Sequence, residues 1–492
     1  MLGIGMWVLM LAGSGAIHYY LWIRLVRDTS RPATLGRRLG TGAVVVSALA
    51  APGTRIVTPL FDPSEDGAGR WVAWPGYTLI GVLIYLLMGL VVLEAPRAFL
   101  VRRWRRAERE AGREAGPEAE PVTVSSTVVA ADAADAADAS DASGTAGTAD
   151  AVGASGPADT AELVAATATS HASTATEVPE IPEVPEVSKP TETPGTPGDP
   201  GAPETSAPPS RLLVGRRLFL GRAVGVLAGA TALGTVGHGM SVALGDPLIK
   251  RVLITLSKVN ARLAGLRIAV VSDVHLGPML GRSHTERIVR MINELEADLV
   301  AIVGDLADGT ASQLGPAARP FKGLESRYGS YFVTGNHEYL YDGVEDWLDE
   351  MRAVGVRPLV NERVEIRHNG TFLDLAGVED LAGEETGRGP DLERALAGRD
   401  TSRPVVLLAH QPVFAEEAAR HGVDLQLSGH THGGQMFPLT GVTALSNPVS
   451  AGLGKVDDTT LYVTSGAGFF GPPVRVGVPP DITLLELRPA DV

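Results

Sequence analysis

The sequence predicts an α/β domain in its C-terminal half, preceded by membrane-spanning helices and a disordered linker. Long apolar stretches occupy the first quarter of the 492 residues, and Ala, Asp, Pro and Glu dominate the central part. From about residue 262 onward, short β-rich runs alternate with helical patterns. This alternation is typical of α/β domains, and the uneven composition indicates a chain built from several parts.

Residues 1–106 are predicted to form a membrane region with about three transmembrane segments. The apolar stretches cover residues 2–23, 39–60 and 76–93. Each is close to the ~20 residues that a helix needs to cross a hydrocarbon core. Pro52, Gly53 and Arg55 interrupt the second stretch, so an imperfect span and a re-entrant element are both compatible with it.

Arginine residues set the expected orientation of these segments. Two clusters follow the first and third stretches: Arg24, Arg27, Arg31, Arg37 and Arg38, and then Arg97, Arg102, Arg103, Arg105 and Arg106. The loop between the second and third stretches, FDPSEDGAG, is acidic instead. Because cytoplasmic loops carry an excess of Lys and Arg, we expect both clusters in the cytoplasm and the acidic loop outside.

Residues 107–210 are predicted to be a disordered linker rich in Ala and Asp and then in Pro and Glu. Small residues, prolines and like charges cannot bury enough surface to offset the conformational entropy of the chain. Much of the net charge of −15 gathers in this tract.

Residues 215–245 combine paired arginines with a long apolar run rich in Gly and Ala. This pattern predicts a fourth transmembrane segment that enters from the cytoplasmic side and carries the following domain outward. The sequence RRLFL at 216–220 also resembles a twin-arginine export motif, so a signal anchor is an alternative reading. Both alternatives predict a multi-pass protein of the cytoplasmic membrane with an extracytoplasmic C-terminal domain.

Composition excludes several classes of function. The chain contains no cysteine, so disulfides, thiolate zinc sites and cysteine nucleophiles are absent. The C-terminal half has no evident cluster of Lys and Arg, which argues against a nucleic-acid partner because phosphate backbones require clustered basic residues. Nothing in the sequence specifies an oligomeric state.

The predicted α/β domain covers residues 262–490. Its apolar runs share one design, in which a strand-like segment ends in polar residues. These runs are LRIAVVSD (266–273), DLVAIVGD (298–305), GSYFVTGNHE (329–338), RPVVLLAH (403–410) and VDLQLSGH (423–430), with a helix predicted at 283–297. In open α/β sheets, ligands gather at the carboxyl ends of the strands.

The polar ends carry carboxylate, imidazole and amide groups. They are Asp273, His275, Asp305, Asn336, His337, His410, His430 and His432. Alternation along an extended segment would point Asp273 and His275 the same way, toward one ion, and would relate His430 and His432 likewise. Such a sulfur-free set suits two divalent metal ions such as Mn²⁺, Fe²⁺ or Zn²⁺ better than Mg²⁺.

The ordered motifs SDVHLG, GDLADG, GNHE, AHQP and GHTHGGQ resemble those of the calcineurin-like metallophosphoesterase superfamily. The form of GHTHGGQ, with SDVHLG and GDLADG, is most similar to its membrane-anchored or exported bacterial branch. The resemblance covers roughly residues 262–490 and implies a two-sheet α/β sandwich.

The resemblance also implies a role for each motif residue. Asp273, His275 and His432 would bind the first metal, Asn336, His410 and His430 the second, and Asp305 would bridge them. His337 would stand beside the scissile phosphate, with Asp308 orienting its imidazole. Independently of the resemblance, Asp308 also suits the N-cap of a following segment.

The predicted function is that of a membrane-anchored dimetal phosphoesterase. It would hydrolyse a phosphodiester or phosphomonoester with metal-activated hydroxide, because paired cations lower the pKa of a bound water. Membrane attachment suggests a lipid-linked or cell-envelope substrate. The alternative is a non-hydrolytic, metal-binding membrane signalling module.

Several further residues carry weaker expectations. Gly433 and Gly434 are expected where the backbone passes close to metal and substrate and needs unrestricted φ. We expect His284 on the surface, and Arg475 in a packing or surface role rather than in contact with a phosphate. His368 and His421 are expected to face solvent.

Overall fold

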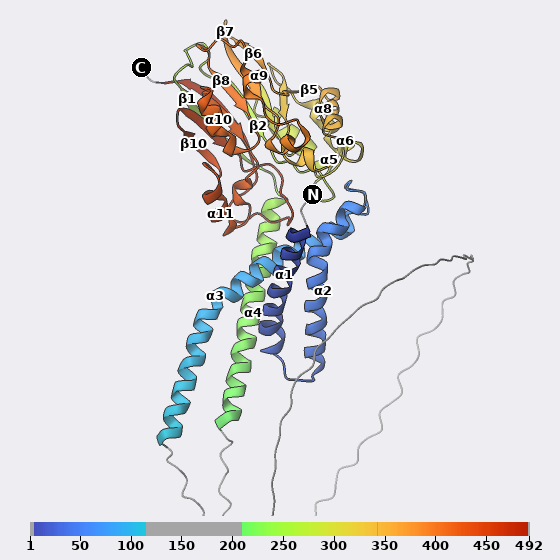
Figure 1. Ribbon diagram of the computed structural model, residues 1–492, viewed down its shortest axis with the longest axis vertical. Helices are drawn as coiled ribbons and strands as arrows, with labels where there is room; N and C mark the ends of the chain where they lie inside the picture. Colours follow the sequence, from blue (N-terminus) through green and yellow to red (C-terminus); the bar gives the residue numbers. More distant parts are fainter. Residues whose placement is uncertain (1–3, 115–208, 342, 491–492) are drawn as a thin grey trace, which may run out of the picture. The chain divides into compact units, whose positions relative to one another are not determined.

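The computed structural model describes residues 4–114, 209–341 and 343–490, and Figure 1 shows their helices and strands. The predicted linker lies largely outside the described residues, but its first part, up to Glu114, continues a long helix. The helices that precede the sheets are α1 (Ile4–Leu21), the π-helix η1 (Trp22–Arg27), α2 (Leu35–Val57), η2 (Thr58–Leu60), α3 (Arg70–Glu114) and α4 (Pro209–Ala243).

Among the described residues, three helices are long and apolar enough to cross a membrane: Leu35–Leu60, Arg70–Glu110 and Gly215–Ala243. They correspond to the second, third and fourth predicted segments. The second is helical through Pro52, so the interruption in its sequence does not end the helix. The first predicted span forms α1, and its crossing stays a prediction because its first residues lie outside the described part.

Two six-stranded sheets form the C-terminal domain, which confirms the predicted two-sheet α/β sandwich. In order across the first sheet, the strands are β1 (Leu248–Leu256), β12 (Asp481–Pro489), β2 (Arg267–Val271), β3 (Leu299–Val303), β4 (Ser330–Val333) and β5 (Val356–Pro358). The second sheet contains β10 (Gly452–Val456), β11 (Thr459–Val463), β9 (Leu425–Ser428), β8 (Val405–Leu408), β7 (Thr371–Gly377) and β6 (Glu362–His368).

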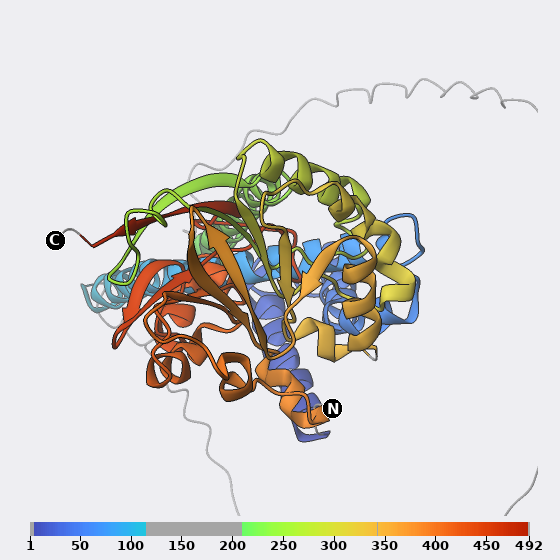
Figure 2. The ribbon, with the colours of Figure 1, turned by 90° about the horizontal axis from the view of Figure 1, so that it is seen from above.

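Helices cover the outer faces of both sheets, and Figure 2 shows the sheets facing each other between them. α5 (Arg282–Asn293), α6 (Ala311–Ala318) and α8 (Val344–Ala353) cover the first sheet and α10 (Ala415–Arg420) covers the second, whereas α11 (Leu439–Ser446) contacts η6 and buries no residue. Short helical segments are η3 (Arg319–Gly323), α7 (His337–Leu340), η4 (Leu381–Thr386), α9 (Leu392–Leu396), η5 (Pro412–Phe414) and η6 (His432–Gly434).

Three apolar cores hold these layers together. One lies between the sheets and includes Ile268 of β2 and Leu427 of β9. A second packs α5, α6 and α8 against the first sheet, and a third packs α9 and α10 against the second sheet. Helix α5 shows the cause in its sequence, because Ile288 and Ile292 are buried while Glu286 and Arg290 face solvent.

The domain begins before the predicted boundary at residue 262. Strand β1 pairs in parallel with β12 along its whole length, from Leu248 opposite Asp481 to Leu256 opposite Pro489. It therefore belongs to the first sheet although it follows α4 closely in sequence. The hairpins β6–β7 and β10–β11 were also not predicted, and α5 ends at Asn293, earlier than the predicted helix.

Candidate metal centre

The predicted site residues follow the carboxyl ends of parallel strands in both sheets. In the first sheet β2, β3 and β4 run parallel, and in the second β7, β8, β9 and β11 do. Asp273 follows β2, Asp305 follows β3, Asn336 follows β4, His410 follows β8 and His430 follows β9. The two sheets therefore deliver their polar ends to one region of the sandwich, as the strand pattern predicted.

The first donor cluster consists of Asp273, His275 and His432, which are all buried. The Nε2 atoms of the two imidazoles lie 2.9 Å apart, and His432 Nε2 lies 3.3 Å from Asp273 Oδ1. These are the three residues that the resemblance assigns to the first metal.

The second donor cluster consists of Asp305, His410 and His430. His410 donates from Nδ1 to the carbonyl oxygen of Val303 at 2.8 Å, which leaves Nε2 as the ring atom that faces Asp305 Oδ2 at 3.2 Å. Asn336 joins this cluster, since its Oδ1 lies 2.8 Å from His430 Nδ1. The structure thus brings the predicted residues of the second metal together.

Asp305 lies between the two clusters. Its Oδ2 atom is 3.2 Å from His410 Nε2 in one cluster and 3.8 Å from His275 Nε2 in the other. This is the position that a bridging carboxylate requires. A backbone contact also links the clusters, because the N–H of His430 donates to the carboxylate of Asp273.

The donor set fits divalent cations. His410 Nε2 is buried and has no hydrogen-bond partner among the described residues, which is costly unless another group satisfies it. Within each cluster, one ligand atom from every residue lies within 4.8 Å of the others. Imidazole nitrogens with carboxylate and amide oxygens are ligands of Mn²⁺, Fe²⁺ and Zn²⁺.

Asp308 holds two imidazoles rather than one. Its Oδ1 accepts hydrogen bonds from His337 Nδ1 at 2.7 Å and from His275 Nδ1 at 2.9 Å. The contact with His337 matches the predicted orienting role, and the contact with His275 was not predicted. Because both Nδ1 atoms donate, the Nε2 atom of His275 is left with its lone pair toward the first cluster.

Charge around these residues shifts their pKa values. Burial opposes ionisation of Asp308, but the imidazoles of His275 and His337 outweigh it and hold the pKa of the carboxyl well below its usual range. Burial likewise disfavours the charged form of His337, yet Asp305 and Asp308 raise its pKa to about 9. A protonated imidazole therefore stands at the edge of the centre at neutral pH.

The backbone at the site is left-handed, not extended. Asp273, His275, Asp305, His430 and His432 have φ values of 53°, 49°, 52°, 69° and 49°. The expectation that extended alternation aligns Asp273 with His275 is therefore wrong, although both side chains do enter one cluster. Left-handed conformations cost energy in residues other than Gly, and such strain concentrates at functional sites.

Gly433 and Gly434 have φ values of 58° and 80°, so the predicted need for unrestricted φ is confirmed. The atoms that a side chain at either position would meet do not belong to the candidate metal ligands. A Cβ atom on Gly434 would lie 2.5 Å from Thr440 Cα, and one on Gly433 would lie 2.8 Å from Val478 Cγ1. These glycines allow the turn to pack against Val478, which precedes β12, and against helix α11.

Arg475 takes the packing role of the two that were considered. Its side chain is fully buried, and it donates to the carbonyl oxygens of His432 at 3.0 Å and Gly468 at 3.1 Å. It also lies 3.0 Å from His432 Nδ1. A guanidinium only donates, so Nδ1 of His432 accepts in this contact and the proton of a neutral ring is on Nε2. For a metal to bind at Nε2, that proton must leave, and moving it to Nδ1 would break the contact with Arg475.

Glu338, the last residue of GNHE, has a role that the sequence did not indicate. Its buried carboxylate accepts hydrogen bonds from the backbone N–H groups of Gly335, Asp305 and Leu306. It thereby fixes the loop that carries Asp305. The only sequence signal for Glu338 was its place in the GNHE motif. Its burial could not be predicted locally, because it depends on the packing of β3 beside β4.

Two histidines expected on the surface are buried. His284 is 3% exposed within α5, and His368 is 6% exposed, with hydrogen-bonding contacts to Tyr328 and Asn369. The expectation for both is therefore wrong. His421, by contrast, is half-buried near the end of α10.

Imidazole, carboxylate and amide groups gathered at adjoining strand ends, most of them buried, are the kind of site that metal-dependent hydrolases use. A family model described as calcineurin-like phosphoesterase matches residues 266–434. A protein of Helicobacter pylori named as an uncharacterized metallophosphoesterase is 38% identical over 260 residues, which cover 52% of this chain and 68% of that relative. The chain belongs to the calcineurin-like metallophosphoesterase family.

Two further relatives are also similar to this chain. One from Aquifex aeolicus, also named as an uncharacterized metallophosphoesterase, is 36% identical over 228 residues, covering 45% of this chain and 85% of the relative. A bovine (Bos taurus) relative, named as a transmembrane protein with metallophosphoesterase domain, is 42% identical over 287 residues, or 56% of this chain. The match spans 64% of the bovine relative, which is less than two thirds of its length.

Proposed function

We propose that this chain is a membrane-anchored phosphoesterase that uses two divalent cations, Mn²⁺, Fe²⁺ or Zn²⁺, to hydrolyse a phosphodiester or phosphomonoester. The observation that carries the proposal is the position of Asp305 between two buried donor clusters. Asp273, His275 and His432 hold one cation, and His410, His430 and Asn336 hold the other. Bound cations supply charge stabilisation for phosphoryl transfer and activate a water for attack.

His337 acts as the proton donor in this proposal. Asp308 fixes its Nδ1 at 2.7 Å, so Nε2 carries the proton that can pass to the departing ester oxygen. Asp308, which binds no cation in this proposal, favours the charged form of the imidazole against the effect of burial. Positioned acid catalysis of this kind contributes about 10²–10⁴-fold to the rate.

The proposed location is the outer side of the cytoplasmic membrane. The loop between α2 and α3 lies against the C-terminal domain, since a Cβ atom on Gly281 would meet the side chain of Glu65. The loop and the domain therefore belong on the same side. The arginine clusters that end near Arg38 and Arg106 lie at the opposite ends of α2 and α3, which supports a cytoplasmic place for them.

Hydrolysis by the full chain in detergent tests the proposed reaction. The metal-stripped protein is reloaded with Mn²⁺, Fe²⁺ or Zn²⁺ and assayed with bis-p-nitrophenyl phosphate and p-nitrophenyl phosphate. We expect turnover that Asp305→Asn and His337→Ala abolish or reduce at least about 100-fold. The matched controls Asp458→Asn and His421→Ala, on residues away from the centre, should retain it.

The rival function is a non-hydrolytic, metal-binding membrane signalling module. It requires metal binding without turnover of any phosphoester by the reloaded protein. Loss of turnover in Asp305→Asn with retention in Asp458→Asn would contradict the rival. Absence of turnover on mono- and diesters under every metal would contradict the proposed function.

A further inference from the structure

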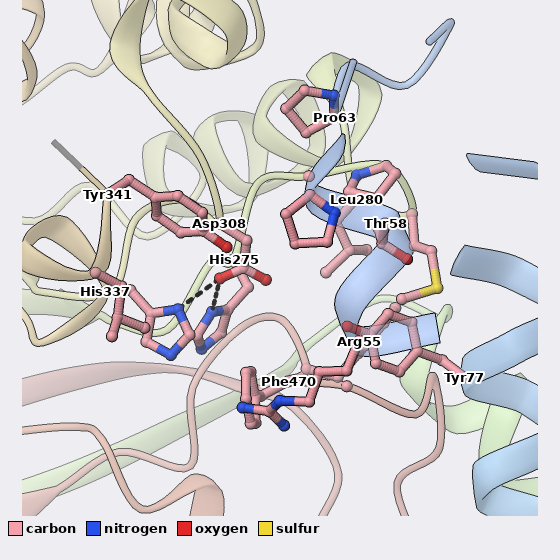
Figure 3. Close-up of a pocket in the computed structure, with 17 residues that line it drawn as sticks. Arg55, Thr58, Pro63, Tyr77, His275, Leu280, Asp308, His337, Tyr341 and Phe470 are labelled. Atoms are coloured by element: carbon pink, nitrogen blue, oxygen red, sulfur yellow. Dashed lines mark hydrogen bonds and ion pairs between the residues drawn. The ribbon is translucent and has the colours of Figure 1, made fainter. Parts of the chain in front are cut away.

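The pocket beside the candidate metal centre is built partly by the membrane helices. Figure 3 shows His275, Asp308 and His337 on one side and Arg55, Thr58 and Tyr77 on the other. Arg55 lies near the end of α2, Thr58 in η2 and Tyr77 near the start of α3. A substrate that reaches the centre through this pocket therefore contacts residues from the predicted spans.

Arg55 places an unpaired cation in this pocket. Within the described part of the chain, no carboxylate lies within 4.0 Å of its guanidinium. The guanidinium stands 5.3 Å from the ring centroid of Phe470, and that ring lies 5.1 Å from the ring of His337. An arginine one aromatic ring away from the centre is suited to bind an anionic phosphate, because its planar fork matches phosphate oxygens.

An apolar groove between α2 and α3 adjoins the pocket. Its lining includes Leu49, Ala50 and Gly53 of α2 and Pro75 and Leu79 of α3. Leu49 is 71% exposed, so the groove opens toward the surroundings of the helices. Both helical segments lie within candidate spans, where those surroundings are lipid acyl chains.

The groove and the pocket are lined by residues that are adjacent along α2 and α3. Thr54 and Gly76 line the groove, and the next residues along the chain, Arg55 and Tyr77, line the pocket. Helices α2 and α3 are in contact between these residues, because a Cβ atom on Gly76 would meet the side chain of Thr54. The two cavities therefore present neighbouring surfaces, one suited to a polar end and one to an apolar end of a molecule.

We propose that the substrate is a phospholipid whose phosphate is bound by Arg55 beside the metal centre and whose acyl chain lies in the α2–α3 groove. This inference rests on the proposed phosphoesterase function. It makes Arg55 a substrate-binding residue and makes the membrane region part of the binding site. If the membrane region served only as an anchor, activity would not depend on the acyl chain of the substrate.

The test compares lipid and soluble esters on the full chain in nanodiscs. The lipid probes are long-chain phosphatidic acid and phosphatidylglycerol, and the soluble probe is bis-p-nitrophenyl phosphate. The key variant is Gly53→Leu, which fills the groove, and no atom lies within 4 Å of the added Cβ. The matched control is Gly42→Leu, which also adds its Cβ to open space on α2 but outside the groove.

We expect Gly53→Leu to lower kcat/KM about tenfold or more for the hydrolysed lipid and to leave the soluble ester within about twofold. Gly42→Leu should leave both unchanged. Arg55→Gln should raise KM about tenfold for both esters, whereas Arg38→Gln, at the other end of α2, should not. Equal effects of Gly53→Leu and Gly42→Leu on lipid hydrolysis would overturn the inference.

A second readout does not depend on catalysis. A phosphatidic acid with a diazirine on its acyl chain should crosslink to the α2 and α3 groove residues in metal-stripped protein, and Gly53→Leu should abolish this crosslink. Crosslinks spread evenly over α1–α4 would overturn the inference. Hydrolysis of the soluble ester without lipid hydrolysis or groove crosslinking refutes the phospholipid alone, whereas groove crosslinking without hydrolysis of any ester refutes the phosphoesterase.

Discussion

Asp308 shows how a single carboxylate organises the candidate centre. It fixes His337 and His275 through the same oxygen, at 2.7 and 2.9 Å. The resemblance implied only the first contact, because the second arises from the packing of the β3 loop against the β2 loop. Asp308 therefore links a candidate metal ligand, His275, with the proposed proton donor.

Replacing Asp308 by Asn should weaken both functions together. The amide keeps the size of the side chain but removes the charge that holds the two imidazoles. We expect kcat/KM for bis-p-nitrophenyl phosphate to fall about 10–100-fold, with weaker metal binding, as is typical for partners of ligating histidines. The exposed variant Asp349→Asn serves as control, and equal activities of the two variants would contradict the role of Asp308.

The buried His284 predicts a pH dependence of stability that is separate from catalysis. Burial lowers the pKa of His284 from 6.5 to about 3. Between these values the unfolded chain binds more protons than the folded chain, so the folded state loses stability as the pH falls below 6.5. The slope from this one group is at most about 1.4 kcal/mol per pH unit.

Thermal unfolding of the wild-type chain and of His284→Leu at pH 7.5 and pH 5 measures this effect. Acid should lower the unfolding midpoint of the wild type more than that of the variant. An identical acid shift in both proteins would show that His284 is not buried in its neutral form.

At the scale of elements, the short helix α7 and strand β3 are tied together by Glu338. Its carboxylate accepts three backbone hydrogen bonds, from Gly335, Asp305 and Leu306. A glutamine offers only one acceptor oxygen and turns an N–H group toward the same donors. Burial and the neighbouring Asp305 raise the pKa of Glu338 to about 7, so the expected loss comes mainly from the buried donor left unsatisfied, which costs about 1–3 kcal/mol.

Glu338→Gln should therefore lower the free energy of unfolding by about 2–3 kcal/mol and weaken metal binding through the Asp305 loop. Calorimetry and metal titration of the full chain measure both quantities. The exposed variant Glu286→Gln should change neither. A normal stability in Glu338→Gln would show that the three hydrogen bonds do not hold the loop.

The sequence predicted the strands that carry the site better than the strands at the edges of the sheets. Strands β2, β3, β4, β8 and β9 are apolar runs with polar ends, so their pattern is local. Strand β1 forms by pairing with β12, whose residues lie more than 200 positions later in the chain. No local pattern specifies that pairing, and the hairpin strands β6 and β10 are partly exposed and carry no site residue.

The same limit applies to the site. Asp273, Asp305 and the motif histidines were predictable because they stand at strand ends in ordered motifs. The contribution of Arg55 was not, because an arginine near the end of a predicted span is typical of a membrane interface. Only the folded chain brings it near Phe470 and His337.

For the whole molecule, the absence of cysteine offers a direct test of topology. Single cysteines replace Thr34 between α1 and α2, Asp66 between α2 and α3, and Asp458 in the C-terminal domain. Asp66→Cys and Asp458→Cys should react with a membrane-impermeant maleimide on intact spheroplasts, and Thr34→Cys should react only after lysis. Labelling of Thr34→Cys with protection of Asp458→Cys would reverse the proposed orientation.

The central claim is that two donor clusters sharing Asp305 bind the cations that make this chain a phosphoesterase. Its most direct test is a titration of the metal-stripped full chain with Mn²⁺ or Zn²⁺, in which bound metal and hydrolysis of bis-p-nitrophenyl phosphate are measured in the same samples. Turnover should rise with bound metal and saturate near two ions per chain. Full turnover in the stripped protein, or saturation with metal without hydrolysis of any phosphoester, would contradict the claim.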